Sequence, residues 1–230
     1  MNIGIIGCSS GLGFEIYKLL KKNNLVSPFS SARKKNFIKI DLHKLNLKKF
    51  RNDLKKISKI DEVYYISNYS FHKAIKFYSS NDFEKLINFN ILNFCKIIKE
   101  LVLKNQSITI NLVLSHICFM YNRGFVFYKS HKIFQKIFLD SMQIEFPKLK
   151  INFFYPGALN TNFIKHNNYK GRRIFQPTSA KQAAHMIVNR KKKFLTLRDA
   201  ILYYIYKLLP GNIIINFYKV VLKVIYNNKN

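Results

Sequence analysis

The chain has 230 residues, of which 48% are hydrophobic, so it can form one substantial core and is neither a disordered nor a fibrous protein. It has 40 lysines and arginines against 11 aspartates and glutamates, and the formal net charge of +29 indicates an anionic partner: a nucleic acid, a membrane surface or a phosphorylated substrate. The three cysteines show no C-x-x-C spacing and no signal peptide precedes the first apolar run, so we expect free thiols, no metal site and a cytoplasmic protein.

The first predicted element is a strand over residues 2–6, and a glycine-rich loop follows it, with the sequence Gly7-Cys8-Ser9-Ser10-Gly11-Leu12-Gly13. Helical periodicity begins at Phe14. Glycines let the backbone approach a pyrophosphate, and the N-terminus of a helix supplies N–H donors and a positive dipole. The spacing is G-x-x-x-G-x-G rather than the commoner G-x-G-x-x-G. We therefore expect a dinucleotide-binding loop, with a simple glycine-rich turn as the alternative.

The next stretch predicts three more strands, over residues 25–29, 37–40 and 63–66, of which the first is weakened by Pro28. The connection between the first two is too short for a full helix, whereas residues 45–57 have the apolar spacing of one. Polar residues follow each of these strands: Ser31 and Arg33, then Asp41 with Leu42, then Ser67 and Asn68.

The longest predicted helix covers residues 81–104, and Asn81 and Glu84 have the spacing of a capping box. Asn90 lies in the middle of its apolar stripe. A buried amide needs hydrogen-bond partners, so Asn90 is either a link to a neighbouring helix or part of an active site.

A fifth strand, over residues 108–114, ends at Ser115, and a further helix carries Tyr128 and Lys132 on one face. A nearby ammonium lowers the pKa of a tyrosine, which suits the tyrosine to proton exchange near neutral pH. A serine hydroxyl can bind the reacting oxygen as charge grows on it. Taken alone, the Y-x-x-x-K pattern is weak, and an ordinary helical Tyr/Lys pair would explain it.

The last part of the predicted domain holds a sixth strand (150–155) followed by Pro156-Gly157, a basic loop (162–178), a helix (179–191) and a short strand (194–196). Strands that alternate with helices predict an α/β fold with a doubly wound parallel sheet and helices on both faces. The polar residues that follow the strands then converge on one edge of the sheet, where such folds bind ligands.

Together these motifs resemble those of the short-chain dehydrogenase/reductase family, in its one-domain, Rossmann-type branch, over residues 2–196. The positions that match the family's catalytic residues are Asn90, Ser115, Tyr128 and Lys132. The positions that match its cofactor-binding motifs, or flank them, are Gly7, Ser9, Ser10, Gly11, Leu12, Gly13, Ser31, Arg33, Asp41, Leu42, Ser67, Asn68, Tyr128, Lys132, Pro156, Gly157 and Thr161.

The resemblance implies an NAD(P)-dependent oxidoreductase acting on CH-OH or carbonyl groups. Tyr128 would protonate a substrate carbonyl as NAD(P)H delivers hydride, and Ser115 would hold the oxygen. Lys132 would lower the pKa of Tyr128 and bind the nicotinamide ribose, and Asn90 would order a water molecule in a proton relay. Asp41-Leu42 would contact the adenine ring, and the segment from Pro156 to Thr161 would meet the nicotinamide end.

The chain departs from the family's pattern at two positions. The family's N-N-A-G motif corresponds here to residues 65–68, so that Asn68 replaces a glycine. His116 follows Ser115 where a small residue is common, and we expect it to make a supporting hydrogen bond rather than to take part in catalysis.

We expect NADP rather than NAD, because no acid occurs between Leu25 and Ile40 while Ser31 and Arg33 follow the second strand. An acid there would bind the free 2′-hydroxyl of NAD, whereas an arginine accommodates the 2′-phosphate of NADP. A solvated surface arginine is the alternative.

The resemblance also suggests a homodimer or homotetramer formed through the helices that start near Asn81 and Tyr128. The substrate is expected to be a small carbonyl or alcohol. The basic residues Lys165, Lys170, Arg172 and Arg173 hint at an anionic group on it, with a solvated loop as the alternative explanation. A lipid-linked substrate is suggested by the C-terminal tail, which resembles the tails of family members that act on such substrates. One alternative is an NADP-binding regulator or scaffold on the same fold without turnover. A nucleic-acid partner rests only on the charge, and the chain shows no basic aromatic platform, so none is expected.

Residues 197–230 extend beyond the resemblance and form a basic, amphipathic tail. Asp199 could cap a first helix, Pro210-Gly211 would end it, and a second helix would follow. Neither helix has the ~18 uninterrupted apolar residues of a membrane span. Apolar faces flanked by tyrosines and lysines fit a helix lying on an anionic membrane surface through residues 211–226, on the inner face of the membrane. Packing on the same subunit or on a neighbour is the alternative.

Overall fold

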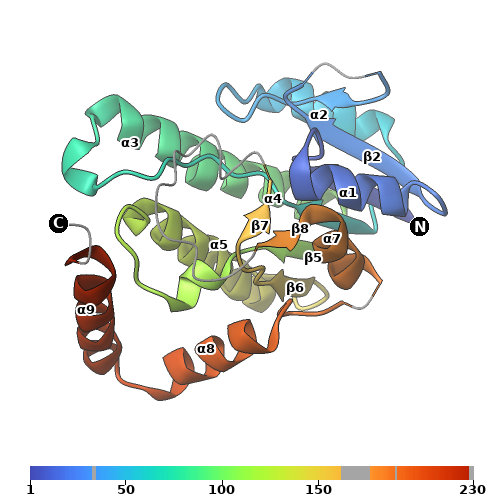
Figure 1. The fold of residues 1–230 in the computed structure, drawn as a ribbon. Coiled ribbons are helices and arrows are strands. Elements are labelled where there is room, and N and C mark those ends of the chain that lie inside the picture. Colours follow the sequence, from blue (N-terminus) through green and yellow to red (C-terminus); the bar gives the residue numbers. More distant parts are fainter. Residues whose placement is uncertain (33–34, 162–176, 190, 228–230) are drawn as a thin grey trace.

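Six parallel strands form one sheet, in the order β3-β2-β1-β4-β5-β6 (Figure 1). The computed structural model describes residues 1–32, 35–161, 177–189 and 191–227. The strands are β1 Asn2–Ile6, β2 Leu25–Ser30, β3 Ile38–Lys39, β4 Glu62–Tyr65, β5 Thr109–Val113 and β6 Lys150–Phe154. The predicted doubly wound α/β sheet is confirmed, and the strand order reverses between β1 and β4, where such sheets bind ligands.

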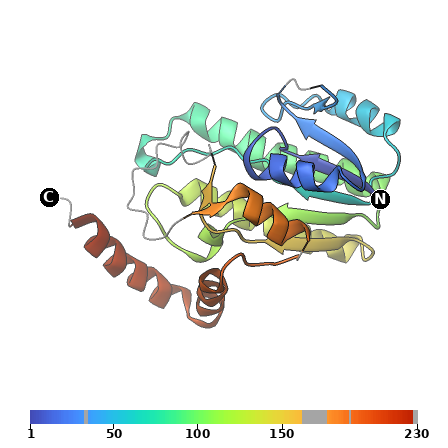
Figure 2. The same ribbon diagram turned by 45° about the vertical axis from the view of Figure 1, so that its right-hand side comes forward.

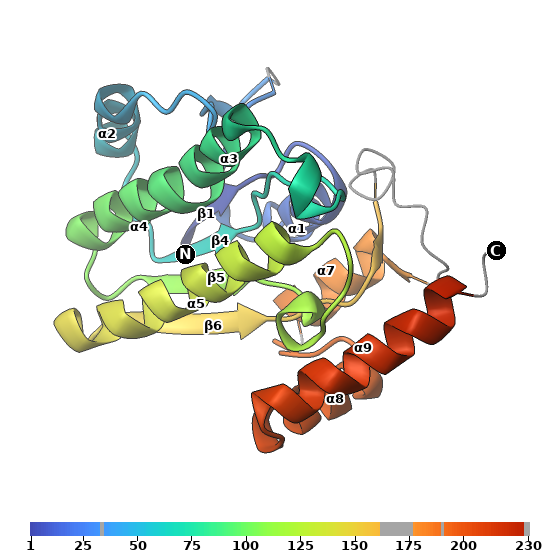
Figure 3. The same ribbon diagram turned by 90° about the vertical axis from the view of Figure 1, so that its left-hand side faces the viewer.

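Helices cover both faces of this sheet. Two apolar helices, α1 (Gly11–Leu20) and α7 (Ala180–Val188), pack on one face together with Ile3 and Ile5 of β1. The other face is covered by α2 (Leu47–Lys56), α4 (Asn93–Lys104) and α5 (Val126–Glu145), as Figure 3 shows. The continuous apolar strands fit this double cover, because a parallel sheet with helices on both faces has no solvent-facing side.

The predicted helix over residues 81–104 begins earlier and changes its winding. It consists of α3 (Ser80–Ile87), a π-helical segment η2 (Asn88–Leu92) and α4. The capping box is formed by Ser79 and Asp82, not by the predicted Asn81 and Glu84. Ser79 Oγ accepts from Asp82 N at 3.2 Å, and Asp82 Oδ2 accepts from Ser79 N at 2.9 Å. The carboxylate of Asp82 also forms an ion pair with Lys73, at 2.6 Å, which holds it in place beside Ser79.

Two of the predicted strands are reduced. β3 has only two residues and pairs with Phe29 and Ser30, so the edge of β2 beside Pro28 carries no partner strand, as the proline suggested. The predicted strand over 194–196 is a single bridge between Tyr155 and Phe194. It cannot continue because Thr196 already caps the next helix.

Several short elements line the C-terminal edge of the sheet. They are the 3₁₀ helices η1 (Ile75–Phe77) and η3 (His116–Phe119) and a small two-stranded sheet of β7 (Leu159–Asn160) and β8 (Thr178–Ser179). Ser179 caps α7 by accepting from Gln182 N at 3.2 Å, as predicted. Most of the predicted basic loop lies outside the described residues.

The tail forms two helices, α8 (Leu197–Leu208) and α9 (Gly211–Asn227), which are separated at Pro210 as predicted. Thr196, not Asp199, is the cap of α8, and Asp199 lies buried in its first turn. One face of α8 packs on η3, where Tyr203 stacks edge-on against Phe119 with ring centres 4.9 Å apart. α9 runs out from the body of the molecule (Figure 2). In the described part of the chain, no helix is long and apolar enough to cross a membrane.

Candidate active site at the C-terminal edge of the sheet

The backbone between β1 and the first turn of α1 requires glycine at positions 7, 11 and 13. Gly7 and Gly11 have positive φ angles of 94° and 54°. A Cβ atom on Gly7 would lie 2.7 Å from Ser67 N, and one on Gly13 would lie 2.0 Å from the carbonyl oxygen of Gly7. A Cβ atom on Gly11 would lie 3.4 Å from the methyl group of Thr161. The loop is therefore closed tightly against two other predicted site residues.

The first turn of α1 has no capping side chain from Ser10 and no acid. The N-terminus of a helix in this state attracts anions through its N–H groups and its dipole. The loop geometry and the helix end would suit a phosphate group, and phosphate binding by this loop stays a prediction.

A small cavity of about 50 Å³ adjoins this loop, below the ends of β1, β2 and β4. It is lined by Gly7, Ser9, Phe29, Ser30, Ser31, Ile40, Leu42, Ser67 and Phe89. Leu42 is buried and its carbonyl oxygen accepts from Asn93 Nδ2 at 2.9 Å. Asp41 Oδ1 accepts from His43 N at 2.9 Å and so shapes the turn after β3. Arg33 lies outside the described residues.

Ser115, Tyr128 and Lys132 meet at the end of β5. Ser115 follows the strand directly and is buried, and its side chain is hydrogen-bonded to Tyr128. Lys132 is 2% exposed and donates from Nζ to the carbonyl oxygen of Val113 at 3.0 Å. The three side chains predicted from their spacing are thus brought to one place, between the sheet edge and α5.

Burial dominates the electrostatics of these residues. Burial raises the pKa of Tyr128 above its ordinary value, and the hydrogen bond with Ser115 opposes that rise. Burial also lowers the pKa of Lys132 to about 8. Loss of water disfavours the charged form of both groups and outweighs the other influences on the Tyr128 pKa, so the expected lowering of that pKa by Lys132 stays a prediction.

Asn90 lies in the π-helical segment and is 1% exposed. Its amide pairs with the backbone of Tyr69, accepting from the N–H at 3.0 Å and donating to the carbonyl at 2.6 Å. It also donates to the carbonyl of Leu86 at 3.1 Å. Its own carbonyl oxygen accepts from Gln135 Nε2 at 2.8 Å. Asn90 therefore holds the segment after β4 against the π-helical segment. Through Gln135 it also connects both of them to α5, the helix that carries Lys132.

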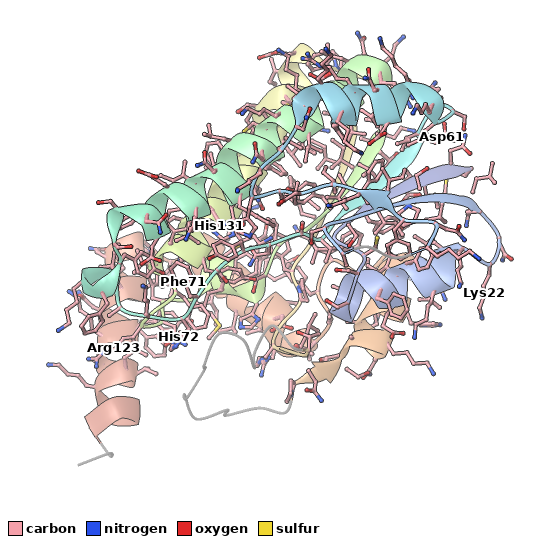
Figure 4. All side chains as sticks on the ribbon, turned by 90° about the horizontal axis from the view of Figure 1, so that it is seen from above. Lys22, Asp61, Phe71, His72, Arg123 and His131 are labelled. Carbon is pink, nitrogen blue, oxygen red and sulfur yellow. The ribbon has the colours of Figure 1, made fainter. Side chains whose placement is uncertain are left out.

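His131 makes a contact that the sequence reasoning missed. It is buried next to Lys132 on α5 (Figure 4), and its Nε2 lies 2.7 Å from Asn68 Oδ1 while Nδ1 lies 3.0 Å from the carbonyl oxygen of Phe127. Burial and the charge of Lys132 hold the pKa of His131 well below its usual range, so the ring is neutral. The Asn68 amide donates from Nδ2 to Ser70 Oγ at 3.3 Å, so its oxygen is the atom that faces the His131 ring. Asn68 thus ties the loop after β4 to α5.

The loops that follow β4 and β5 are also joined to each other near the open end of the site. His72 Nε2 lies 2.9 Å from the carbonyl oxygen of Arg123 (Figure 4). Gly124 has a φ angle of 79°, and a Cβ atom there would lie 2.7 Å from His72 Nε2. The spacing of single residues gave no signal of this contact.

Pro156 and Gly157 follow β6 and face η3 and the start of α8. The carbonyl oxygen of Pro156 lies 3.0 Å from His116 N and 3.2 Å from His116 Nδ1, in agreement with the supporting hydrogen bond expected of His116. Gly157 packs against Asp199. The predicted site residues on all of these strand ends are therefore collected along one edge of the sheet.

Comparison with known proteins gives a fold but no relative by sequence. No protein-family model and no curated protein matches the sequence. A short-chain dehydrogenase from Burkholderia cenocepacia in complex with NADP superposes with a TM-score of 0.78 at 10% identity, over 98% of this chain and 97% of that one. The chain has the short-chain dehydrogenase fold.

Two other solved structures with this fold agree. A short-chain dehydrogenase from Sphingobium yanoikuyae in complex with NADPH has a TM-score of 0.73 at 13% identity, covering 91% of this chain and 96% of that one. An alcohol dehydrogenase from Thermococcus sibiricus, complexed with 5-hydroxy-NADP, has a TM-score of 0.70 at 17% identity, covering 81% and 88%. Identities this low establish the fold, and the function has to be argued from the site.

Proposed function

We propose that the protein is an NADPH-dependent oxidoreductase that reduces a carbonyl to a secondary alcohol, or catalyses the reverse. The observation that carries this proposal is the meeting of Ser115, Tyr128 and Lys132 at the end of β5. Hydroxyl, phenol and ammonium in this arrangement can bind and protonate one carbonyl oxygen.

The cofactor fits the residues present. The glycine loop and the bare N-terminus of α1 suit the pyrophosphate, and the cavity lined by Ser31, Leu42 and Ser67 suits the adenosine half. When bound, NADPH supplies the hydride. NADPH is preferred to NADH because Arg33, with Ser31, accommodates the 2′-phosphate. Arg33→Ala should erode this preference in a binding titration, whereas Lys35→Ala, an exposed cation two residues on, should not. Equal affinity of the wild type for NADH would refute the preference.

Each catalytic side chain has a part in this proposal. Tyr128 keeps its proton because burial raises its pKa, so it can donate that proton to the substrate oxygen. Ser115 holds the oxygen, and Lys132 binds the ribose and returns a proton to the tyrosine. Asn90 supports the relay behind Lys132 through Gln135, whose buried Oε1 has no partner among the described residues and is a place for the relay water.

The alternative is an NADP-binding regulator or scaffold without turnover. A screen of carbonyl metabolites that follows the absorbance of NADPH separates the two. We expect oxidation of NADPH with at least one carbonyl compound. Tight binding of NADPH with no turnover across ketones, aldehydes and lipid-linked carbonyls would favour the regulator.

We also propose that the protein forms a homodimer or homotetramer through the outer faces of two helices, the one built from α3, η2 and α4 and the α5 helix. These faces expose large apolar side chains, namely Ile87, Leu92, Leu103, Phe134, Ile137 and Ile144. Large apolar side chains that gather on exposed helix faces often mark a protein–protein interface. Light scattering on the purified protein tests this: Ile137→Glu should lower the mass of the particle, and a monomeric wild type would refute the proposal.

Finally, we propose that the tail rests on an anionic membrane surface and that the substrate is lipid-linked or anionic. The tail exposes a row of apolar side chains, Ile201, Ile205, Leu208, Ile213, Phe217 and Val220. Three exposed lysines, at 207, 219 and 223, accompany them. Each lysine near an anionic membrane surface contributes about 1 kcal/mol to the free energy of binding. The other side of α8 packs on η3, so the membrane surface lies close to the catalytic edge of the sheet.

A further inference from the structure

The turn Pro156–Gly157 is held on one side by His116. Both the backbone N and the ring Nδ1 of His116 point at the carbonyl oxygen of Pro156, at 3.0 and 3.2 Å. Because that oxygen only accepts, the ring hydrogen lies on Nδ1. His116 follows Ser115 directly, so η3 fixes the serine and this turn together.

The other side of the turn is held by the first turn of α8. A Cβ atom on Gly157 would lie 3.1 Å from Asp199 Oδ2 and 3.3 Å from Arg198 Nη2. The missing side chain thus lets the Arg198–Asp199 pair, whose atoms are 3.2 Å apart, pack directly on the backbone of the turn.

Asp199 is more deeply buried than a residue in the first turn of a helix needs to be. Its side chain is 0% exposed, and it accepts from Thr196 Oγ1 at 2.8 Å. Burying a carboxylate is costly unless it is paired and hydrogen-bonded, and a cap alone works equally well in solvent. The charges of Asp199 and Arg198 also act in opposite directions on the pKa of His116, which burial lowers overall, so both sides of the turn are within electrostatic reach of each other.

Resting on the proposed function, we infer that His116, Arg198 and Asp199 are positioning residues that clamp the turn Pro156–Gly157, and with it the nicotinamide end of the bound cofactor. Residues 196–199, at the start of the tail, then belong to the catalytic unit. The clamp sets which face of the nicotinamide ring meets the substrate, whereas the adenosine half is held elsewhere, by the glycine loop and the small cavity.

The test compares Asp199→Asn and His116→Gln with two controls away from the turn, Asp140→Asn at a half-buried position on α5 and His185→Gln at an exposed position on α7. Three quantities are measured on the full chain: the Kd of NADPH by fluorescence, kcat, and the share of deuterium transferred from NADPH labelled on one face of the ring. In both clamp variants we expect the Kd to change less than about threefold and kcat to fall about tenfold or more. We also expect deuterium transfer to lose its selectivity for one face. Both controls should match the wild type.

A purely structural role would lower the fraction of active protein, and with it the apparent kcat, but would leave the face selectivity of deuterium transfer unchanged, and that result would overturn the inference. If Asp199→Asn does not fold, His116→Gln and Gly157→Ala decide in the same way, since an alanine methyl would push against Asp199. A wild type that does not bind NADPH would overturn the proposed function and this inference with it. A wild type that binds and turns over, with clamp variants that behave like it, would overturn the inference alone.

Discussion

Lys132 is a fully buried lysine whose ammonium is bonded to a backbone carbonyl, that of Val113. Its pKa of about 8 keeps it mostly protonated at neutral pH, so it remains a cation that can bind a ribose hydroxyl. The raised pKa of Tyr128 keeps the phenol protonated. A protonated tyrosine beside a lysine cation suits the direction in which a carbonyl is reduced.

Lys132 should leave a signature in the pH dependence of stability. Its pKa is about 8 in the folded chain, below the ordinary lysine value of 10.5, so the folded state binds fewer protons than the unfolded state between these pH values. The free energy of unfolding therefore gains a contribution from Lys132 as the pH rises from about 8 to 10.5. In chemical denaturation, the wild type should gain stability over Lys132→Met across this window. The exposed control Lys148→Met should stay parallel to the wild type, and parallel curves for Lys132→Met would contradict the burial argument.

The sequence was sufficient to find Ser115, Tyr128 and Lys132, because a strand end and a four-residue helical spacing are local features. It could not give the effect of burial on the tyrosine pKa, since burial depends on elements far apart in the chain. The contact of His131 with Asn68 was missed for the same reason: the two residues are 63 positions apart and meet only when β4 and α5 pack.

The π-helical segment is the element that links the helix layer to the segment after β4, at the C-terminal edge of the sheet. It carries Asn90, whose amide is hydrogen-bonded to both the N–H and the carbonyl oxygen of Tyr69. Single-turn π segments are frequent at functional sites. The apolar stripe of the sequence predicted one continuous α-helix here, because a π turn adds a single residue and barely disturbs the periodicity.

Asn90→Ala should destabilise the protein by about 1–3 kcal/mol, because the N–H and carbonyl of Tyr69 lose their partners. The affinity for NADPH should fall as well, since the segment after β4 loosens beside the glycine loop. Asn88→Ala is the matched control, an exposed asparagine in the same π segment. Denaturation curves and NADPH titrations that coincide for the two variants would show that Asn90 holds nothing in place.

At the scale of the whole molecule, the charge of +29 and the exposed apolar side chains of the tail both support the proposed contact with an anionic membrane surface. The tail is attached through η3, where α8 packs by Tyr203 and Tyr206 against Phe119, and α9 contacts Tyr121 through Tyr218. Helix amphipathicity and the break at Pro210 could be predicted from the sequence. The burial of Asp199 could not, because the sequence showed it only as a helix cap.

Flotation with vesicles tests the membrane surface. The intact protein should float with vesicles that contain anionic lipid and should be released by salt, whereas a chain truncated after Pro210 should remain at the bottom of the gradient. Neutral vesicles are the control, because the lysines need anionic headgroups. Equal flotation of the intact and truncated proteins, or of neither, would show that α9 is not a membrane anchor.

The most direct test of the account is the oxidation of NADPH by the wild type and by Tyr128→Phe, with the best carbonyl compound from the screen. The variant removes only the hydroxyl that Ser115 contacts, and Tyr204→Phe, at an exposed position on α8, is the matched control. We expect Tyr128→Phe to lose about 10²–10⁴-fold in kcat while its Kd for NADPH stays within about threefold of the wild type. An unchanged kcat in Tyr128→Phe would contradict the assignment of Tyr128 as the proton donor and the function built on it.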